Sequence, residues 1–360
     1  MSLQSGNLIS LRPEDLHLPS VMPLPTRKDW AIGMVGFGEF ARRAHAPDYR
    51  KAGWKLAAVA VRNTTAQKAA TELGVEHVYS DYHDLVNDET VEVVDVLTQP
   101  SLRREVVAAA AAAGKHIIVE KPFGMSADEC RRMVEVADQY GVHLAIHQNY
   151  RWQKGCFLAH HIVRAGLVGT PFLMSIEKLG QQDDTRKDSV YATFDDYLTL
   201  HWNTHFVDLF RYWSGRDPQQ VSARTARMIG QNYRSDNFLL SLHDYGAGLM
   251  GHILHSELLR SSLSHDACRI DGDEGSLVFD FAGGHILLDS RKLGQQLHTI
   301  DTSAMTWMDS LCGSMGDLLL AIEGNRQPLV SGRDNLKTMD IVFAEIQSAK
   351  SGGNWTAVTP

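Results

Sequence analysis

Several features that would assign the protein to a specialised class are missing from its sequence. The chain of 360 residues has only 4 cysteines, and their wide scatter gives neither a metal-ligand spacing nor a disulfide framework. No apolar run approaches the ~20 residues that a membrane-spanning helix needs. The first residues lack the basic stretch and the long apolar stretch of a secretory signal. These absences predict a protein of the reducing cytoplasm, without a membrane partner.

An excess of positive charge is missing as well. The formal net charge is -8 and the sequence pI is about 6.1, so no nucleic acid is expected as a partner. The 44% hydrophobic and 22% charged residues are ordinary for folded proteins and exclude a disordered or fibrous chain. A chain of this length can bury two hydrophobic cores, which predicts two folded domains.

Strand and helix patterns alternate along the first part of the chain. Apolar runs predict buried strands at 31–35, 56–61, 91–97, 116–119 and 142–146. Helices are predicted between them at 40–51, 65–73, 104–113 and 128–140. This alternation is typical of a parallel, doubly wound α/β sheet. We therefore predict a first domain over residues 29–148. Residues 1–28 contain four prolines (13, 19, 23 and 25) and are predicted to form an extended N-terminal arm, either disordered or clasping a neighbouring subunit.

The pattern changes after about residue 148. Strands are predicted at 172–178, 221–226, 237–243, 248–255, 267–270, 276–279 and 285–288. Helices are predicted at 156–165, 201–213, 308–323 and 334–349. Runs of strands without helices between them favour an antiparallel sheet. Residues 149–360 are therefore predicted to form an α+β domain with a large, mostly antiparallel open sheet, which binds substrate and forms the oligomer contacts.

A glycine-rich loop joins the first strand to the first helix. Its sequence, Gly36-Phe37-Gly38-Glu39-Phe40-Ala41, has the G-x-G-x-x-A pattern. The first glycine permits the tight turn, the second lets a pyrophosphate approach the backbone, and the helix N-terminus favours the phosphate charge. A purely structural tight turn is the alternative. The position of the loop at the start of a βαβ series predicts an NAD(P)-binding Rossmann domain.

Four further motifs follow in order along the chain. They are AGKHIIVEKP at 113–122, NYRW at 149–152, HFVDLFRYW at 205–213 and PLVSGRDNLK at 328–337. With the glycine loop, they resemble the signatures of the Gfo/Idh/MocA family, the glucose–fructose oxidoreductase and inositol dehydrogenase group, over residues 30 to 355. The resemblance implies an NAD(P)-dependent oxidoreductase that interconverts a secondary alcohol and a ketone on a sugar, inositol or related polyol. It also implies a homo-oligomer, a homodimer or a homotetramer.

Lys121 is the first predicted catalytic residue. It follows a strand whose carboxyl end faces the ligand crevice of a doubly wound sheet. There its ammonium group can donate hydrogen bonds to a substrate oxygen and stabilise the charge that develops as hydride leaves carbon. Pro122 restricts Lys121 to extended backbone, and the resemblance suggests a cis peptide between them. Glu120 is expected to pair with the cofactor ribose or with Lys121. The alternative is an ordinary surface lysine.

His205 is the second predicted catalytic residue. By resemblance it is the acid/base that takes the hydroxyl proton, a task that suits histidine because its ordinary pKa lies near neutrality. Asp208 lies one turn along the helix and is expected to bind substrate or orient His205. A packed histidine and a capping or ion-paired aspartate are the alternatives. His201 stands where sugar-oxidising members usually carry aspartate, and Arg103 where many carry histidine. Arg103 could as easily be a surface charge.

The predicted sites can be stated residue by residue. The predicted cofactor contacts are Gly36, Phe37, Gly38, Glu39, Phe40, Arg62, Asn63, Thr98, Glu120 and Lys121. The predicted substrate contacts are Lys121, Arg151, His201, His205 and Asp208. His201 and His205 have the i, i+4 spacing of a metal-binding helix, but no glutamate lies between them in the metalloprotease manner, and no metal is predicted.

The second strand bears on the choice of cofactor. It ends in Val61-Arg62-Asn63, without the acidic residue that accepts hydrogen bonds from the ribose 2′-hydroxyl in NAD-binding Rossmann domains. Arg62 offers a permanent cation to a 2′-phosphate. Binding of the 2′-hydroxyl through Asn63 or backbone keeps NAD open. We therefore expect NADP or NAD, with NADP favoured.

Two other functions remain open for this fold. One is a non-catalytic regulator that senses a dinucleotide or a sugar. The other is a glycosidase that holds a nicotinamide tightly. The intact Glu120-Lys121-Pro122 motif and His205 favour an enzyme.

Overall fold

The computed structural model describes residues 8–281, 283–294 and 296–359. Their contacts form two compact units. The Rossmann unit consists of Met22–Trp152 and Met308–Leu336, and the sheet unit of Met1–Val21, Gln153–Trp307 and Lys337–Pro360. This grouping differs from the predicted boundaries because residues 308–336 return to the Rossmann unit. There helix α9 (Ser310–Glu323) packs on the 3-10 helix Asn149–Trp152.

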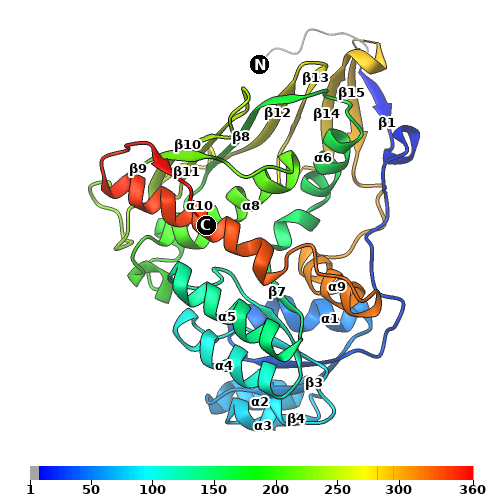
Figure 1. The fold of residues 1–360 in the computed structure, drawn as a ribbon, viewed down its shortest axis with the longest axis vertical. Coiled ribbons are helices and arrows are strands. Elements are labelled where there is room, and N and C mark those ends of the chain that lie inside the picture. Colours follow the sequence, from blue (N-terminus) through cyan, green and yellow to red (C-terminus); the bar gives the residue numbers. More distant parts are fainter. Residues whose placement is uncertain (1–7, 282, 295, 360) are drawn as a thin grey trace. The chain divides into compact units, whose positions relative to one another are not determined.

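The Rossmann unit is built on a six-stranded parallel sheet, of which β3, β4 and β7 are labelled in Figure 1. Its strands are β2 (Ala31–Val35), β3 (Lys55–Ala60), β4 (His77–Tyr79), β5 (Val93–Val96), β6 (His116–Val119) and β7 (Leu144–Ile146). Its helices are α1 (Ala46–Ala52), α2 (Thr64–Glu72), α3 (Tyr82–Val86), α4 (Pro100–Ala112) and α5 (Ala127–Tyr140). The strand order β4-β3-β2-β5-β6-β7 reverses direction at β2. Such a reversal opens a ligand crevice beyond the carboxyl ends of β2 and β5.

The sheet unit contains ten strands. They are β1 (Ile9–Leu11), β8 (Pro171–Leu179), β9 (Gln220–Ala226), β10 (Phe238–Asp244), β11 (Met250–Ser256), β12 (His265–Gly272), β13 (Gly275–Phe279), β14 (His285–Ser290), β15 (Gln296–Asp301) and β16 (Thr356–Ala357). Their order is β1-β15-β14-β13-β12-β8-β11-β10-β9-β16. Among the described strands of this sheet, only β1 with β15 and β8 with β11 pair in parallel. The predicted α/β Rossmann domain followed by an α+β domain with a mostly antiparallel sheet is therefore confirmed.

Residues 1–28 were predicted to form an extended arm. In its described part, β1 pairs with β15 and a 3-10 helix forms at Pro13–Leu16. Residues 1–7 lie outside the described residues. Proline 13 occupies the first turn of that helix, where a missing N–H costs nothing. The described arm up to Val21 therefore belongs to the sheet unit, whereas the rest of it, from Met22, belongs to the Rossmann unit.

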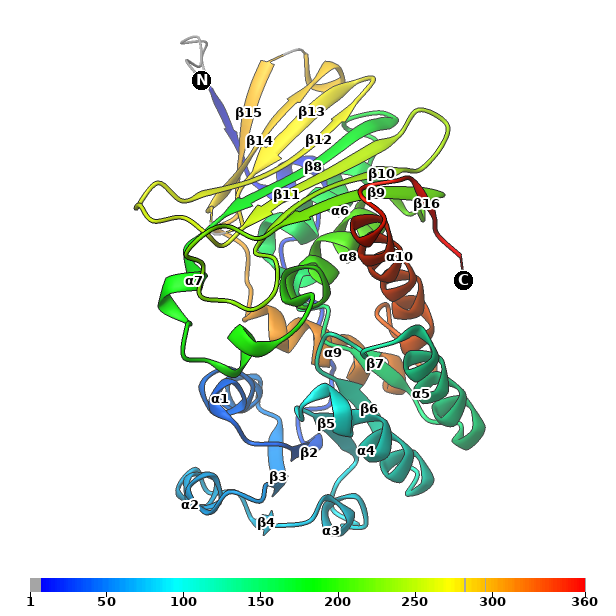
Figure 2. The ribbon, with the colours of Figure 1, turned by 90° about the vertical axis from the view of Figure 1, so that its left-hand side faces the viewer.

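Helices cover one face of the ten-stranded sheet. Helices α6 (Lys154–Arg164) and α8 (Asn203–Ser214) lie against this face (Figure 2). The unit also contains the short helix α7 (Gln182–Thr185) and most of α10 (Gly332–Lys350). Strand β10 shows the contrast between the faces: Leu239 and Ser241 are buried, whereas Leu240 and Leu242 are 41% and 39% exposed. The second face is thus partly apolar and accessible. None of the described helices has the length and apolar character needed to cross a bilayer.

Candidate active site

The glycine loop leaves room for a ligand. Gly36 has a φ of +97°, and a Cβ there would lie 2.9 Å from the carbonyl oxygen of Leu97, so only glycine fits. A Cβ on Gly38 would meet nothing within 4 Å. Ala41, in the third position of the motif, is buried. The backbone at Gly38 therefore faces open space of the kind that a pyrophosphate needs, and the loop fits the predicted cofactor.

Thr98 supports the same assignment from the neighbouring strand. It follows the carboxyl end of β5, and its backbone nitrogen lies 3.2 Å from the Cβ position of Gly36. Its hydroxyl oxygen is buried and has no hydrogen-bond partner in the described structure. Because a buried hydroxyl without a partner is costly, a ligand group is expected to complete it.

The end of the second strand is only partly available to a cofactor. Arg62 is exposed. Asn63 is the N-cap of α2, and its side-chain oxygen accepts a hydrogen bond of 3.0 Å from the backbone of Ala66. That oxygen is therefore already engaged, and contact of Asn63 with the cofactor stays a prediction.

Arg103 connects two loops at the carboxyl edge of the Rossmann sheet. It is buried in α4, donates from Nε to the carbonyl of Thr98 over 3.1 Å, and donates from Nη1 to the carbonyl of Pro122. The alternative that Arg103 is a surface charge is therefore wrong. The Lys121–Pro122 peptide is cis, as the resemblance suggested. Arg103 thus ties the loop after β5 to the loop that carries Lys121.

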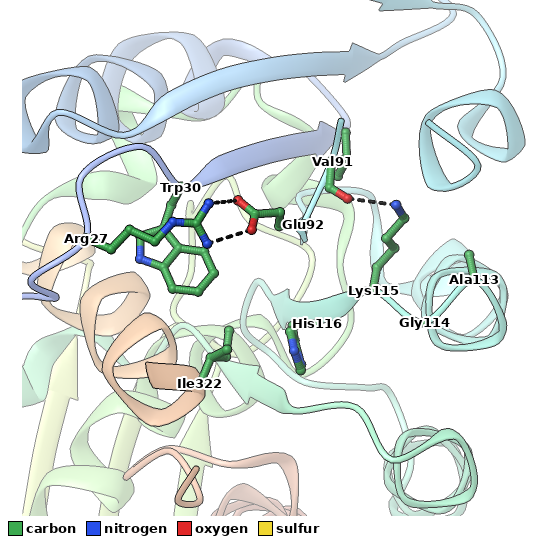
Figure 3. Close-up of a pocket in the computed structure, with 9 residues that line it drawn as sticks. All are labelled: Arg27, Trp30, Val91, Glu92, Ala113, Gly114, Lys115, His116 and Ile322. Carbon is green, nitrogen blue, oxygen red and sulfur yellow. Dashed lines mark hydrogen bonds and ion pairs between the residues drawn. The ribbon is translucent and has the colours of Figure 1, made fainter. Parts of the chain in front are cut away.

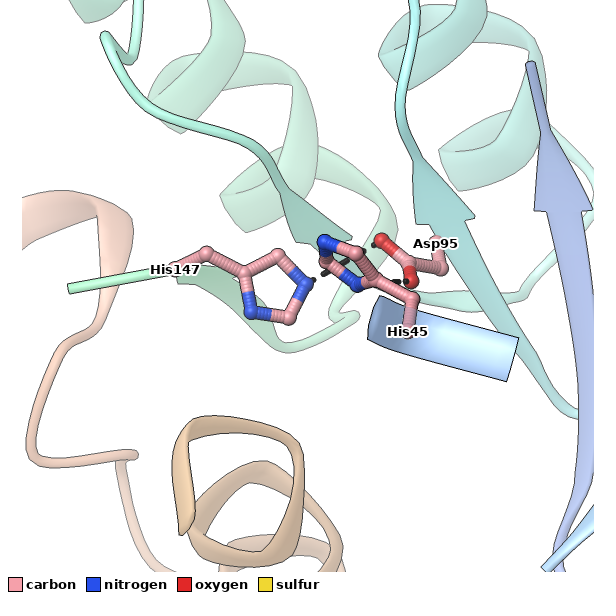
Figure 4. Close-up of side chains that lie close together, drawn as sticks. All are labelled: His45, Asp95 and His147. Carbon is pink, nitrogen blue, oxygen red and sulfur yellow. Dashed lines mark hydrogen bonds and ion pairs between the residues drawn. The ribbon is translucent and has the colours of Figure 1, made fainter. Parts of the chain in front are cut away.

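The Rossmann unit also contains a buried network of acids and histidines that the sequence analysis missed; Figure 4 shows three of its members, His45, Asp95 and His147. The glycine-loop helix runs through a π-helical turn, Ala41–His45, before α1. His45, at the end of that turn, lies with Nδ1 3.3 Å from Asp95 Oδ2 and Nε2 3.2 Å from Glu120 Oε1. Asp95 Oδ1 also lies 3.1 Å from His147 Nε2. One signal was present in the sequence: Asp95 interrupts an apolar buried strand, where a carboxylate needs partners.

The network stabilises charge on its members. Burial by itself would lower the pKa of His45, but hydrogen bonds and charges from Asp95 and Glu120 outweigh it and raise this pKa to about 9. Burial would raise the pKa of Asp95, but His147 and His45 bring it far below its ordinary value. Burial likewise opposes ionisation of Glu120, yet His45, with the charges of His147 and Lys121, lowers its pKa.

The same side chains resemble a metal-ligand set. Ligand atoms of His45, Asp95 and His147 lie within 4.8 Å of one another. The hydroxyl of Tyr49, however, lies 2.8 Å from Asp95 Oδ2, 3.2 Å from His45 Nδ1 and 3.5 Å from His147 Nε2. It reaches the three groups that an ion would have to bind, so we interpret the cluster as a hydrogen-bond network.

The predicted proton-transfer residue belongs to the sheet unit. His205 is buried in α8. Asp208 is also buried, and it accepts a hydrogen bond of 3.2 Å from Thr338, whose hydroxyl also accepts one from Arg211. Asp208 is thus at least partly engaged in packing α8 against α10, and its contact with substrate stays a prediction.

His201 and Arg151 have structural contacts of their own. His201 lies in a π-helical turn, Leu198–Trp202, and stacks on Tyr197 with ring centroids 4.9 Å apart. Since α8 begins at Asn203, a π turn interrupts the regular i, i+4 geometry between His201 and His205. Arg151 donates to the carbonyl of Leu329 and pairs with Asp334, each over 2.9 Å. These contacts do not test the predicted substrate roles.

The predicted residues fall into two groups. The carboxyl edge of the Rossmann sheet brings together the glycine loop with Gly36, Phe37, Gly38, Glu39 and Phe40, the residues Arg62, Asn63 and Thr98 that follow the adjacent strands, and Glu120 with Lys121. Arg151 is in the same unit. His201, His205 and Asp208 belong to the sheet unit.

A cavity of about 380 Å³ lies at the opposite, amino-terminal edge of the Rossmann sheet (Figure 3). Its two cationic side chains already have partners. Arg27 makes two contacts of 2.7 Å with Glu92 and lies 4.2 Å from the ring centre of Trp30. Lys115 donates to the carbonyls of Asp88 and Val91. The cavity lies at the edge opposite the glycine loop. We interpret its contacts as structural ones, which hold the starts of the strands in place.

Comparison with known proteins identifies the family. Residues 30–148 match the model of the oxidoreductase family with an NAD-binding Rossmann fold, and residues 158–278 match the GFO/IDH/MocA C-terminal domain. The chain belongs to the Gfo/Idh/MocA family of oxidoreductases.

Relatives of known name cover nearly the whole chain. It is 26% identical to D-apiose dehydrogenase of Paraburkholderia graminis over 91% of this chain and 89% of that protein. It is 23% identical to myo-inositol 2-dehydrogenase of Thermotoga maritima, over 88% and 95% respectively. A levoglucosan dehydrogenase in complex with NADH and levoglucosan shares the fold, with a TM-score of 0.82, 21% identity and coverage of 92% and 100%.

Proposed function

We propose that the protein is an NAD(P)-dependent dehydrogenase that interconverts a secondary alcohol and a ketone on a sugar, inositol or related polyol. The observation that carries the proposal is the carboxyl edge of the Rossmann sheet, with open space at Gly38 and an unpartnered Thr98 hydroxyl beside it. The apiose, inositol and levoglucosan dehydrogenases among its relatives support the substrate class.

Two side chains divide the chemistry in this proposal. A bound nicotinamide supplies the hydride acceptor for oxidation and the donor for reduction. Lys121 donates a hydrogen bond to the reacting oxygen and stabilises its developing negative charge. His205 takes the hydroxyl proton during oxidation and returns it during reduction. Glu120, ionised beside Lys121, holds that cation and the nicotinamide end of the cofactor.

Turnover of free cofactor on a panel of sugars and polyols tests this function. A dehydrogenase reduces added NAD or NADP in step with substrate oxidation. A glycosidase with a bound nicotinamide cleaves its substrate without consuming free cofactor, and a regulator binds sugar without turnover. The four cysteines are buried and form no disulfide within the described part of the chain, which supports the proposed location in a reducing cytoplasm.

We expect NADP to bind more tightly than NAD. No carboxylate follows β3 to repel a 2′-phosphate, and Arg62 is exposed where it can clasp one. Replacing Arg62 with alanine should weaken NADP binding by about tenfold and leave NAD binding nearly unchanged. Isothermal titration of both cofactors measures this, with Arg132→Ala on α5 as a control. Tighter binding of NAD by the native protein, or unchanged NADP affinity in Arg62→Ala, contradicts the prediction.

We also expect a homodimer or homotetramer. The open face of the ten-stranded sheet exposes Leu240 and Leu242 on β10, and a partly apolar sheet face is stabilised by burial against a partner. Light scattering at micromolar concentration should give a multiple of 40.0 kDa. Leu240→Asp should lower that mass, whereas Ile229→Asp, on an exposed turn, should not. A monomeric native protein would refute the prediction.

A further inference from the structure

His45 joins two carboxylates that belong to neighbouring strands. Asp95 comes from the interior of β5, and Glu120 directly follows β6. The imidazole is fully buried between them, and the Glu120 side chain is only 12% exposed. Phe40, in the glycine loop, packs edge-on against the imidazole, with ring centroids 5.1 Å apart. The histidine therefore connects the glycine loop to the strand end that carries Lys121.

Both ring nitrogens of His45 face acceptors. Nε2 faces the Glu120 carboxylate, and Nδ1 faces Asp95 and the Tyr49 hydroxyl. Because Tyr49 donates its own proton to Asp95 over 2.8 Å, Nδ1 meets only acceptors. A histidine that donates from both nitrogens is an imidazolium. His45 is therefore a buried cation held between two anions.

We propose that His45 is a positioning residue, which holds the Glu120 carboxylate in place beside Lys121. The carboxylate is then already ionised and correctly oriented to accept a hydrogen bond from the nicotinamide half of the cofactor. The π-helical turn at Ala41–His45 positions His45 for this role. A π turn contains one more residue than an α turn, and this turn ends at His45 itself. This proposal rests on the proposed function. It adds a role for His45, which the family motifs did not indicate.

Cofactor binding measured against a fragment tests the proposal without requiring turnover. ADP carries the adenosine and pyrophosphate of NADH but lacks the nicotinamide and its ribose. In His45→Gln and in Glu120→Gln, NADH affinity should fall by about tenfold, while ADP affinity changes by less than about twofold. His243→Gln is the matched control, because His243 forms a fully buried pair with Glu345 in the sheet unit, over 2.9 Å. It should change neither affinity, although it removes a similar buried pair.

The outcomes separate the two proposals. If Glu120→Gln weakens NADH binding and His45→Gln does not, the positioning role of His45 is refuted and the proposed function stands. If the native protein binds neither NADH nor NADPH more tightly than ADP, both proposals fail. Equal weakening of NADH and ADP in His45→Gln indicates a merely structural role and overturns the inference.

A second measurement covers the case in which His45→Gln does not fold. Nitrogen NMR of labelled histidines in the native protein should show one imidazolium that persists at pH 8, although an ordinary histidine is neutral there. The charged and titratable groups around His45 are Asp95, Glu120, His147, Tyr49 and Asp48. Glu120→Gln should shift that signal toward the neutral form. A neutral His45 at pH 7 would donate from one nitrogen only and would overturn the proposal.

Discussion

Replacing Lys121 with alanine is expected to lower kcat by about 10²- to 10³-fold, the usual cost of removing one donor to a developing oxyanion. The cofactor should still bind, because the glycine loop and Thr98 are untouched. Steady-state kinetics and cofactor titration on the same preparation measure the two effects. The expected pattern is a loss of kcat with a much smaller change in cofactor affinity.

The chain offers a matched control for that experiment. Lys115 precedes β6, as Lys121 follows it, and its ammonium group binds the carbonyls of Asp88 and Val91. Lys115→Ala should reduce stability without changing kcat. Near-normal turnover in Lys121→Ala would rule out the catalytic assignment. An equal loss of kcat in both variants would point to folding rather than chemistry.

His205→Asn should also reduce the rate of oxidation strongly, by about 10²-fold or more. Asparagine keeps the approximate size of the side chain but cannot accept the hydroxyl proton. In the native enzyme, oxidation should fall at acidic pH as the base becomes protonated, and this limb of the pH profile should flatten in the variant. The rate of oxidation across the pH range, at saturating cofactor, measures both effects.

His201→Asn is the informative companion. His201 stacks on Tyr197 and is partly exposed, so it could take over as base. If the acidic limb persists in His205→Asn and disappears in His201→Asn, the proton acceptor is His201. If both variants keep the limb, the base lies elsewhere and the assignment of His205 is wrong.

The elements that could be predicted are those with strong local signals. The glycine loop, the buried valine-rich strands and the positive-φ glycines that end helices are set by nearby residues, and β2, β3, β5, β6 and β7 lie where their apolar runs predict them. The short strands β1, β4 and β16 escaped prediction, as did the six-residue strand β15. Their pairing depends on neighbouring strands, and a segment of three residues or fewer has no period to recognise.

The site was predictable only where a motif marks it. Lys121 follows a recognisable strand, whereas nothing local shows that Arg103 turns inward to two carbonyls. His45, Asp95 and His147 are far apart in the sequence. Asp95 and His147 come together through the order β5-β6-β7 in the sheet, and His45 reaches them from the π turn after β2. Their relation depends on strand order and on a π turn, and neither can be inferred from spacing along the chain.

The return of residues 308–336 to the Rossmann unit limits how this protein can be divided by genetic means. The chain passes between its two units near residues 21, 152, 307 and 336, so neither unit is encoded by one continuous segment. A fragment ending at residue 148 would lack α9, and with it Ser314, which lies 2.8 Å from the ring of His147. A transplantable cofactor module would have to carry both segments, joined by a new linker, and single-junction chimaeras with relatives would combine mismatched halves of one core.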